Sequence, residues 1–201
     1  MAGTWILNWN QGLPANYTGL DLGCGKLRYT FPMSRRLRAV TAVDSEVQVS
    51  REQTLFGVRS SVRQYAAEHL PNVHVNSLLE ADWRLEQYDA ILCSNVLSAI
   101  PIQAVRKDLL ATALSLLSPA GTFLLTTQYK NSHFSAWNHC PRAAAYRDGF
   151  LVETRFGTSF YALLDCKALT TMCRSVGFLV GEAGHAKELA YVIARRSSRP
   201  S

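Results

Sequence analysis

The stretch that decides the fold is YTGLDLGCGK, residues 17–26. It begins as a short apolar run, carries the acid Asp21 inside that run, and ends in a turn with glycines at 23 and 25. Glycine adopts positive φ without strain and lets a ligand come close to the backbone. A carboxylate ahead of the glycines repels a phosphate and attracts a cation. The stretch therefore indicates a strand that ends in a binding turn for a positively charged ligand.

Apolar runs on either side of this stretch alternate with helical segments. The run AVTAV at 39–43 is continuous and rich in β-branched residues, as is typical of a strand buried on both faces of a parallel sheet. Further strands are predicted at 18–22, 73–75, 88–94 and 121–127. Helices are predicted at 26–38 (interrupted by Pro32), from Ser45 to about His69, and at 102–117. This alternation predicts an α/β fold with a parallel sheet.

The last third of the chain has a different character. Residues 128–148 are polar and irregular, and residues 149–164 predict a hairpin around Phe156-Gly157-Thr158. A helix is expected at 165–176, followed by strands at 177–184 and 188–195. The loop between these two strands is too short for a crossover, so the last strand is expected to be antiparallel.

The totals predict one globular domain over residues 1–201. Hydrophobic residues make up 48% and charged residues 18%, which is not a disordered composition. Within this domain we expect residues 1–16, with Trp5 and Trp9, to form an N-terminal flap or short helix. Residues 128–164 are expected to form an acceptor-side loop and hairpin, and residues 196–201 a frayed tail.

Charge and cysteine content narrow the possible partners and locations. The formal net charge is +6, which permits nucleic acid as a partner, but no dense basic run interleaved with aromatics is present. The five cysteines form no CxxC pair, so neither a metal site nor a disulfide framework is predicted. We expect a cytoplasmic protein without signal peptide or membrane segment, with an oligomeric state that the sequence leaves open.

Candidate site residues lie where the predicted parallel strands end, because ligands bind beyond the carboxyl ends of such strands. Asp44 follows its strand roughly twenty residues after the glycine turn, the separation at which an acid meets a ribose hydroxyl pair in this architecture. As an alternative, Asp44 would act as the N-cap of the next helix. Ser94-Asn95 and the loop from Gln128 to His133 follow the fourth and fifth strands.

Four segments in this order resemble the class I S-adenosylmethionine-dependent methyltransferases. They are DLGCG (21–25), AVD (42–44), YDAILCSNVLSAIP (88–101) and SPAGTFLLTT (118–127), within a resemblance that runs from about Tyr17 to Arg195. The resemblance implies a Rossmann-like, seven-stranded, mostly parallel sheet with helices on both faces and an antiparallel last strand. It also implies S-adenosylmethionine as cofactor and S-adenosylhomocysteine as product.

The resemblance assigns the cofactor contacts residue by residue. It implies that the ribose lies at Asp44 and the adenine beside Ser45, and that the amino-acid part lies at Asp21, Gly23, Cys24 and Gly25. An acid and a hydrophobic residue after the third strand flank the adenine in this family. Asp82-Trp83 has this chemistry and is preferred, whereas Ser77-Leu78 has the more usual distance from Asp89. Ser94 and Asn95 complete the expected cofactor contacts.

One position departs from the family pattern. Leu27 stands where the family has a glycine, two residues after Gly25. We therefore expect that the third close approach of backbone to cofactor is lost or is made differently. Either the following helix starts differently or the cofactor is held more weakly.

On the acceptor side, Tyr129 and His133 are the expected catalytic residues, with His133 as a general base. Tyrosine, tryptophan and phenylalanine are frequent in this part of the chain and favour a small planar or aromatic acceptor. No NPPY-type tetrapeptide or Pro-Cys follows the fourth strand, which argues against the DNA methyltransferases that use them.

Three other functions remain as alternatives. One is a cofactor-binding protein that is catalytically idle or depends on a partner, and a weaker one, resting on the +6 charge, is a nucleic-acid methyltransferase. The nearest rival, a nicotinamide dehydrogenase, usually has a glycine where this chain has Arg28.

Overall fold

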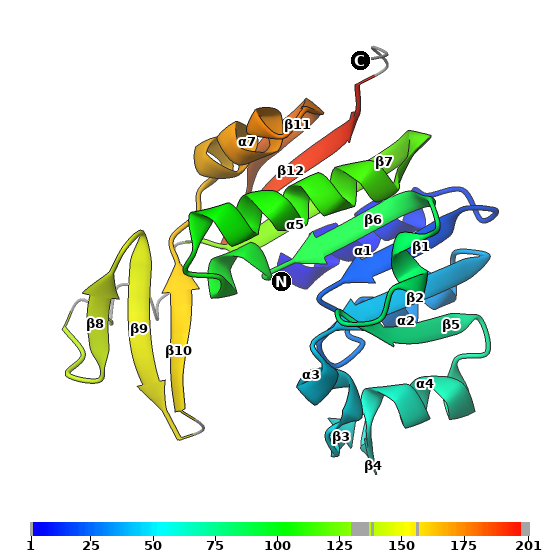
Figure 1. The fold of residues 1–201 in the computed structure, drawn as a ribbon, viewed down its shortest axis with the longest axis horizontal. Helices are drawn as coiled ribbons and strands as arrows, with labels where there is room; N and C mark the ends of the chain where they lie inside the picture. Colours follow the sequence, from blue (N-terminus) through cyan, green and yellow to red (C-terminus); the bar gives the residue numbers. More distant parts are fainter. Residues whose placement is uncertain (1, 130–136, 138, 156, 198–201) are drawn as a thin grey trace. The chain divides into compact units, whose positions relative to one another are not determined.

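A seven-stranded sheet, in the order β11-β12-β7-β6-β1-β2-β5, forms the framework of the chain (Figure 1). The computed structural model describes residues 2–129, 137, 139–155 and 157–197. The strands of this sheet are β1 Thr18–Leu22, β2 Ala39–Asp44, β5 Val73–Ser77, β6 Tyr88–Ser94, β7 Leu117–Gln128, β11 Phe178–Ala186 and β12 Leu189–Arg196. β1 runs parallel to β2 and β6, and β2 runs parallel to β5. β12 is antiparallel to both β7 and β11, so the predicted mostly parallel sheet with an antiparallel last strand is confirmed.

Two compact units contribute to this sheet. The N-terminal unit consists of Gly3–Leu92 and Leu116–Thr122, and the C-terminal unit consists mainly of Cys93–Ser115 and the chain from Phe123 onward. β6 and β7 each pass from one unit into the other. The expected single domain over residues 1–201 stays a prediction.

In the N-terminal unit, the continuous apolar runs form the core strands. Leu20, Ala42, Val43 and Ile91 are completely buried, as expected for strands covered on both faces. The helices of this unit are α1 Ala2–Gln11, α2 Thr30–Ser34, α3 Glu46–Ser50 and α4 Val62–His69. α2 and α3 pack on β2, and α3 and α4 pack on β5.

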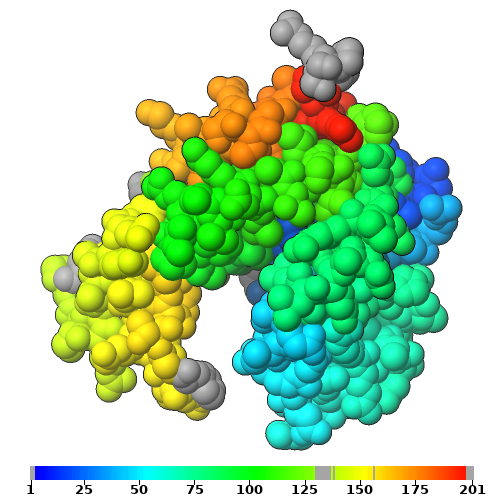
Figure 2. Space-filling view, viewed as in Figure 1, coloured from blue at the N-terminus to red at the C-terminus, as the bar shows by residue number. Residues whose placement is uncertain are grey.

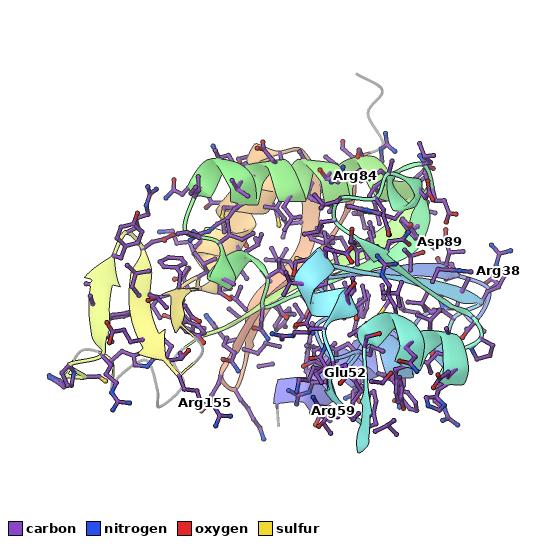
Figure 3. The ribbon with its side chains drawn as sticks, turned by 60° about the horizontal axis from the view of Figure 1, so that its bottom comes forward. Arg38, Glu52, Arg59, Arg84, Asp89 and Arg155 are labelled. Atoms are coloured by element: carbon purple, nitrogen blue, oxygen red, sulfur yellow. The ribbon has the colours of Figure 1, made fainter. Side chains whose placement is uncertain are left out.

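The single long helix predicted from Ser45 to about His69 is wrong. α3 ends at Ser50, and a hairpin of β3 Gln53–Leu55 and β4 Val58–Ser60 precedes α4 (Figure 1). Figure 2 shows this part of the chain, coloured cyan, at the surface. Its two-residue turn, Phe56-Gly57, has positive φ at both positions, 46° and 89°. Glu52 and Arg59, labelled in Figure 3, form an ion pair of 3.1 Å between Oε2 and Nε at its base. The hairpin forms because a glycine turn lies between two short segments that contain β-branched residues.

Two other N-terminal segments had a helix among their predictions, and the structure defines the extent of each helix. Of the helix expected over 26–38, only α2 is helical, and Pro32 lies within its first turn, where a missing N–H leaves no helical hydrogen bond unmade. Residues 1–16, predicted as a flap or short helix, contain the helix α1. Ile6 is buried, whereas Trp5 and Trp9 are half-buried.

The C-terminal unit contains the predicted helices α5 Gln103–Leu116 and α7 Cys166–Ser175. α7 packs on β11 and β12, and the rings of Phe123 and Phe178 stack with centroids 4.6 Å apart. The Asp165 carboxylate accepts a 2.7 Å hydrogen bond from Ala168 N and caps α7. No helix in the described part of the chain is long and apolar enough to cross a membrane.

A separate three-stranded sheet, β10-β9-β8, belongs to the same unit. β9 Gly149–Thr154 and β10 Gly157–Ala162 pair antiparallel, which confirms the predicted hairpin over 149–164. β8 Ala143–Tyr146 adds a third strand that the sequence does not predict. Its alanine-rich sequence has weak strand preference, so it becomes a strand only through pairing with β9.

Candidate functional site

The turn after β1 is bound to the end of β2. The backbone N–H groups of Gly23 and Cys24 both donate to the Val43 carbonyl oxygen, at 2.7 and 3.1 Å. Gly23 and Gly25 have positive φ, 89° and 53°. A Cβ atom added at Gly25 would meet no atom within 4 Å. The backbone at Gly25 is therefore open to a ligand, as the sequence predicts for this turn.

Leu27 keeps a glycine-like backbone although it is a leucine. Its φ is 61°, in the left-handed region that costs an ordinary residue about 1 kcal/mol. Its side chain is completely buried, and its N–H donates to the Cys24 carbonyl oxygen at 2.9 Å. Burial of the leucine side chain offsets the strain. The missing glycine thus leaves the left-handed backbone in place, and α2 begins only at Thr30.

Asp44 joins the end of β2 to the glycine turn. Its Oδ2 accepts a 2.9 Å hydrogen bond from Gly25 N, and its Oδ1 accepts one of 2.7 Å from Ser45 N. Ser45, and not Asp44, is the N-cap of α3, because the Ser45 hydroxyl accepts from Gln48 N. Asp44 is half-buried, and a carboxylate has about four lone-pair positions, so two acceptor positions remain.

Gln48 also supports the turn, which sequence reasoning missed. Its Nε2 donates to the Gly25 carbonyl oxygen at 2.7 Å. The available signal was its position four residues after Asp44, in the first turn of the helix that follows the strand.

Asp21 lies inside the protein under the turn. Asp21 is 2% exposed, and its Oδ2 accepts a 2.6 Å hydrogen bond from the Thr30 hydroxyl. Burial is the largest cause that raises the pKa of Asp21 to about 6; the Thr30 hydroxyl lowers it and the Asp44 charge raises it. Asp21 is therefore a buried acid that is bonded to Thr30 and whose charged form is disfavoured by burial.

Cys24 contributes backbone only. Its side chain is buried, and burial is the largest cause that raises the pKa of its thiol. A thiol in that environment is an unreactive part of the core.

Of the two candidate pairs for the adenine, only Ser77-Leu78 lies beside Asp44. Ser77 is the strand partner of Asp44 on β5, and Leu78 N donates to the Asp44 carbonyl oxygen at 2.9 Å. Ser77 is buried and Leu78 is half-buried.

Asp82-Trp83 lies on the 3-10 helix η1 Asp82–Arg84, which precedes the amino end of β6. Trp83 is 2% exposed, and Arg84 lies over its ring at 4.7 Å. The pair lines a cavity of about 240 Å³ with residues that include Thr41 and Tyr88, well before the carboxyl ends of their strands. Asp82 itself is exposed. Trp83 therefore acts as a core side chain of the N-terminal unit.

In the C-terminal unit, Ser94 and Asn95 connect the ends of β6 and β7. Thr126 Oγ1 donates to Ser94 Oγ at 2.9 Å, and Asn95 N donates to the Thr126 carbonyl oxygen at 2.8 Å. Asn95 has a left-handed φ of 62°, and its Oδ1 accepts a 2.8 Å hydrogen bond from Gln128 N. Asparagine tolerates this conformation better than most residues. The two side chains thus have a structural role at the strand ends, whatever they bind.

Tyr129, the first residue after β7, is held by the β11–β12 turn. Its N–H donates to the Glu188 carbonyl oxygen at 2.6 Å, and its ring stacks on His185 with centroids 4.9 Å apart. Sequence reasoning missed His185, because only the antiparallel pairing of β11 and β12 brings it to Tyr129. His133, the expected general base, lies outside the described residues.

An aromatic group also lies on the three-stranded sheet. The ring of Trp137 is 4.8 Å from that of Tyr161 and 6.0 Å from that of Phe150. These rings supply flat apolar surface in the C-terminal unit.

Comparison with known proteins gives one family. A family described as "Methyltransferase domain" matches residues 20–123. The uncharacterized protein YmfD of Escherichia coli (strain K12) is 32% identical over 177 residues, which cover 88% of this chain and 79% of that protein.

Solved structures share the fold at low sequence identity. The DhpI–SAH complex matches with a TM-score of 0.69 at 15% identity, over 98% of this chain and 85% of that one. The 1,6-didemethyltoxoflavin-N1-methyltransferase of Burkholderia thailandensis, with bound 1,6-didemethyltoxoflavin and S-adenosylhomocysteine, matches with a TM-score of 0.64 at 17% identity. That match covers 97% of this chain and 76% of the other.

Proposed function

Because this chain belongs to the methyltransferase-domain family, we propose that it transfers a methyl group from S-adenosylmethionine to a small planar or aromatic molecule. S-Adenosylhomocysteine is the product released. The single observation that carries the proposal is the Asp44 carboxylate bound to the N–H of Gly25, at a position where an added Cβ atom would meet no atom within 4 Å. A cofactor with a ribose and a positive charge fits this arrangement of donors and acceptors.

The residues around the turn suit the three parts of this cofactor. Asp44 would hold the ribose, because its two remaining acceptor positions match a pair of hydroxyl groups. The turn at Gly23–Gly25, with the charge of Asp21 beneath it, would hold the amino-acid part. For the adenine we favour Ser45 and Leu78 over Trp83, because Leu78 is bonded to Asp44 and Trp83 is part of the core.

Bound S-adenosylmethionine supplies a methyl group activated by a sulfonium. The chain's own task is then to orient the acceptor in line and to accept a proton where the acceptor carries one. We propose Tyr129 and His133 for these roles. The ring of Tyr129 is stacked on His185, which supports its role in orienting the acceptor, because a side chain held in one position orients a planar molecule well.

Two further observations support an active enzyme in the cytoplasm. Leu27 has a left-handed φ of 61°, a conformation that glycine adopts without strain, and this supports a turn that still binds the cofactor. No disulfide joins the five cysteines, all of which belong to the described residues, as is usual in a reducing compartment.

Calorimetric titration with S-adenosylhomocysteine tests the cofactor. We expect binding, and we expect Asp44→Ala to weaken it more than tenfold because a charge-assisted contact to the ribose is lost. Glu52→Ala, which removes an exposed acid of the β3–β4 hairpin, is the matched control and should bind normally. Absence of binding, together with binding of NAD, would overturn the proposal.

Turnover tests the acceptor class. Incubation with S-adenosylmethionine and a panel of planar hydroxy- and amino-aromatic compounds, read by mass spectrometry, should give a product heavier by one methyl group. Transfer to RNA or DNA with none to the small molecules would replace the proposed acceptor with a nucleic acid.

A further inference from the structure

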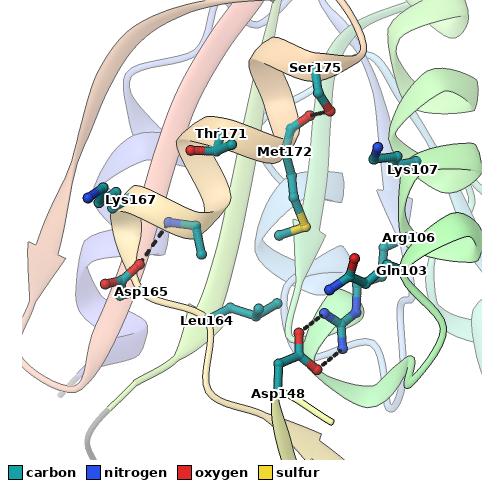
Figure 4. A pocket seen from close by; sticks show the side chains of 11 residues that line it. Gln103, Arg106, Lys107, Asp148, Leu164, Asp165, Lys167, Thr171, Met172 and Ser175 are labelled. Carbon is teal, nitrogen blue, oxygen red and sulfur yellow. Dashed lines mark hydrogen bonds and ion pairs between the residues drawn. The ribbon is translucent and has the colours of Figure 1, made fainter.

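A cavity of about 460 Å³ in the C-terminal unit lies between α5 and α7 (Figure 4). Its volume is in the range of pockets that bind small molecules. α5 supplies Gln103, Arg106 and Lys107 on one side, as Figure 4 shows. α7 supplies the other side with Lys167, Ala168, Thr171, Met172 and Ser175. Among the residues that the structure describes, the lining includes none of the proposed cofactor contacts and does not include Tyr129, although Asp148 and Leu164 belong to the segment 128–164 expected on the acceptor side.

Part of the cavity lining is apolar. Leu164 is 4% exposed, and Met172 and Ala168 are half-buried. Methionine adapts its flexible, polarizable side chain to irregular shapes. This surface suits the carbon skeleton of an organic molecule, whereas a bare inorganic ion would leave it uncovered.

The buried Arg106 forms one wall. It is 1% exposed, its Nε donates to the Ile100 carbonyl oxygen at 2.6 Å, and its Nη1 and Nη2 donate to the two carboxylate oxygens of Asp148. A guanidinium has five N–H groups, so two of them have no acceptor among the residues that the structure describes. The ion pair fixes the guanidinium in place as part of the cavity wall.

Two lysines add charge at the rim. Lys107 and Lys167 are exposed, and neither is ion-paired within the described ranges. The two acidic residues of the lining are already engaged, Asp148 with Arg106 and Asp165 as the cap of α7. The unbalanced charge of the cavity is therefore positive.

We propose that this cavity binds a small organic anion. Its apolar body packs on Leu164 and Met172, and its acidic group lies in the positive field of Lys107 and Lys167 at the rim. A carboxylate, a sulfonate or a phosphate ester on an aromatic or branched aliphatic body has this shared chemistry.

The test uses a pair of fluorescent probes with the full chain. Anilinonaphthalene sulfonate carries an anion on an apolar body, and N-phenyl-1-naphthylamine has the same rings without the sulfonate. We expect the sulfonate to bind at least tenfold more tightly than the neutral probe. The Lys107→Glu/Lys167→Glu double variant should weaken sulfonate binding at least tenfold and leave binding of the neutral probe unchanged. Lys187→Glu, an exposed lysine in the β11–β12 turn, is the matched control and should bind both probes as the wild type does.

A second variant tests whether the probe binds in this cavity. Thr171→Trp places a large side chain at the exposed rim of the cavity and should abolish binding of the sulfonate, with the fold checked by circular dichroism. Saturation with S-adenosylhomocysteine should leave the sulfonate bound. The proposal is overturned if the sulfonate does not bind, if S-adenosylhomocysteine displaces it, or if the charge and rim variants bind it normally. Binding of S-adenosylhomocysteine itself, measured on the same samples, reports separately on the proposed function.

Discussion

Replacing Asp21 by asparagine is expected to stabilise the protein above about pH 6 and to have little effect near pH 4. Asp21 is 2% exposed, so its negative charge is poorly solvated in the folded state. Asparagine has almost the same shape and keeps an oxygen that accepts from the Thr30 hydroxyl. The substitution therefore removes the desolvated charge with little change in packing.

The magnitude follows from the pKa of Asp21. Burial raises it from the ordinary value of 3.8 to about 6 in the folded protein. At about 1.4 kcal/mol per pKa unit, this difference lowers the stability of the wild type by about 3 kcal/mol above pH 6. As the pH falls from 6 to about 4, the folded state takes up a proton that the unfolded state does not, and the penalty disappears. Asp21→Asn should thus gain about 3 kcal/mol at pH 8 and almost nothing at pH 4.

Urea unfolding followed by circular dichroism, at about pH 4 and about pH 8, measures both values for each protein. Asp108→Asn, an exposed acid on α5, is the matched control and should show no such pH-dependent gain. An asparagine variant that is less stable than the wild type at pH 8, or one whose effect is equal at both pH values, would refute the reasoning. The first result would mean that the Asp21 charge stabilises the fold, and the second that packing alone decides the effect.

Three other expected outcomes concern the C-terminal unit and the cysteines. Asp148→Ala should lower the free energy of unfolding by about 3 kcal/mol because it leaves the buried Arg106 charge uncompensated, and Arg106→Met/Asp148→Ala should recover much of that loss in urea titrations. Gly149→Ala should disrupt the three-stranded sheet, since its Cβ would lie 2.0 Å from the Tyr161 carbonyl oxygen; hydrogen exchange of β9 and β10 that stays slow would contradict this. Iodoacetamide under native conditions, followed by mass spectrometry, should label the half-exposed Cys140 and Cys166. It should spare the buried thiols of Cys24, Cys93 and Cys173.

The strands of the sheet could be predicted from the sequence wherever one local signal decides the position or the direction of a strand. Apolar runs identify β2 and β6, because strands covered on both faces tolerate such runs, and the glycine turn after Leu22 marks the end of β1. The short connection before β12 forces an antiparallel pair. The same reasoning placed Asp44 at the end of β2, where it meets the glycine turn.

Other features depend on contacts that a single sequence does not reveal. Residues 45–69 look helical by their composition, yet the turn at Phe56-Gly57 folds part of them into a hairpin. β8 exists because β9 offers it a free edge. Within the candidate site, Thr30 is recognisable as a partner of Asp21 only once the chain has folded back under the turn. The preference for Ser77-Leu78 over Asp82-Trp83 as the proposed adenine-flanking pair rests on the register of β5 against β2.

Leu27 lowers the conformational entropy that the turn after β1 would lose when the proposed cofactor binds there. A glycine at this position would leave the backbone free to sample several conformations before a ligand arrived. The buried leucine side chain instead holds the turn in one left-handed conformation in the free protein. A segment that is already ordered loses little freedom on binding, so more of each contact is retained as affinity. In this chain the turn is ordered when the protein folds, and the ligand meets a surface that is ready for it.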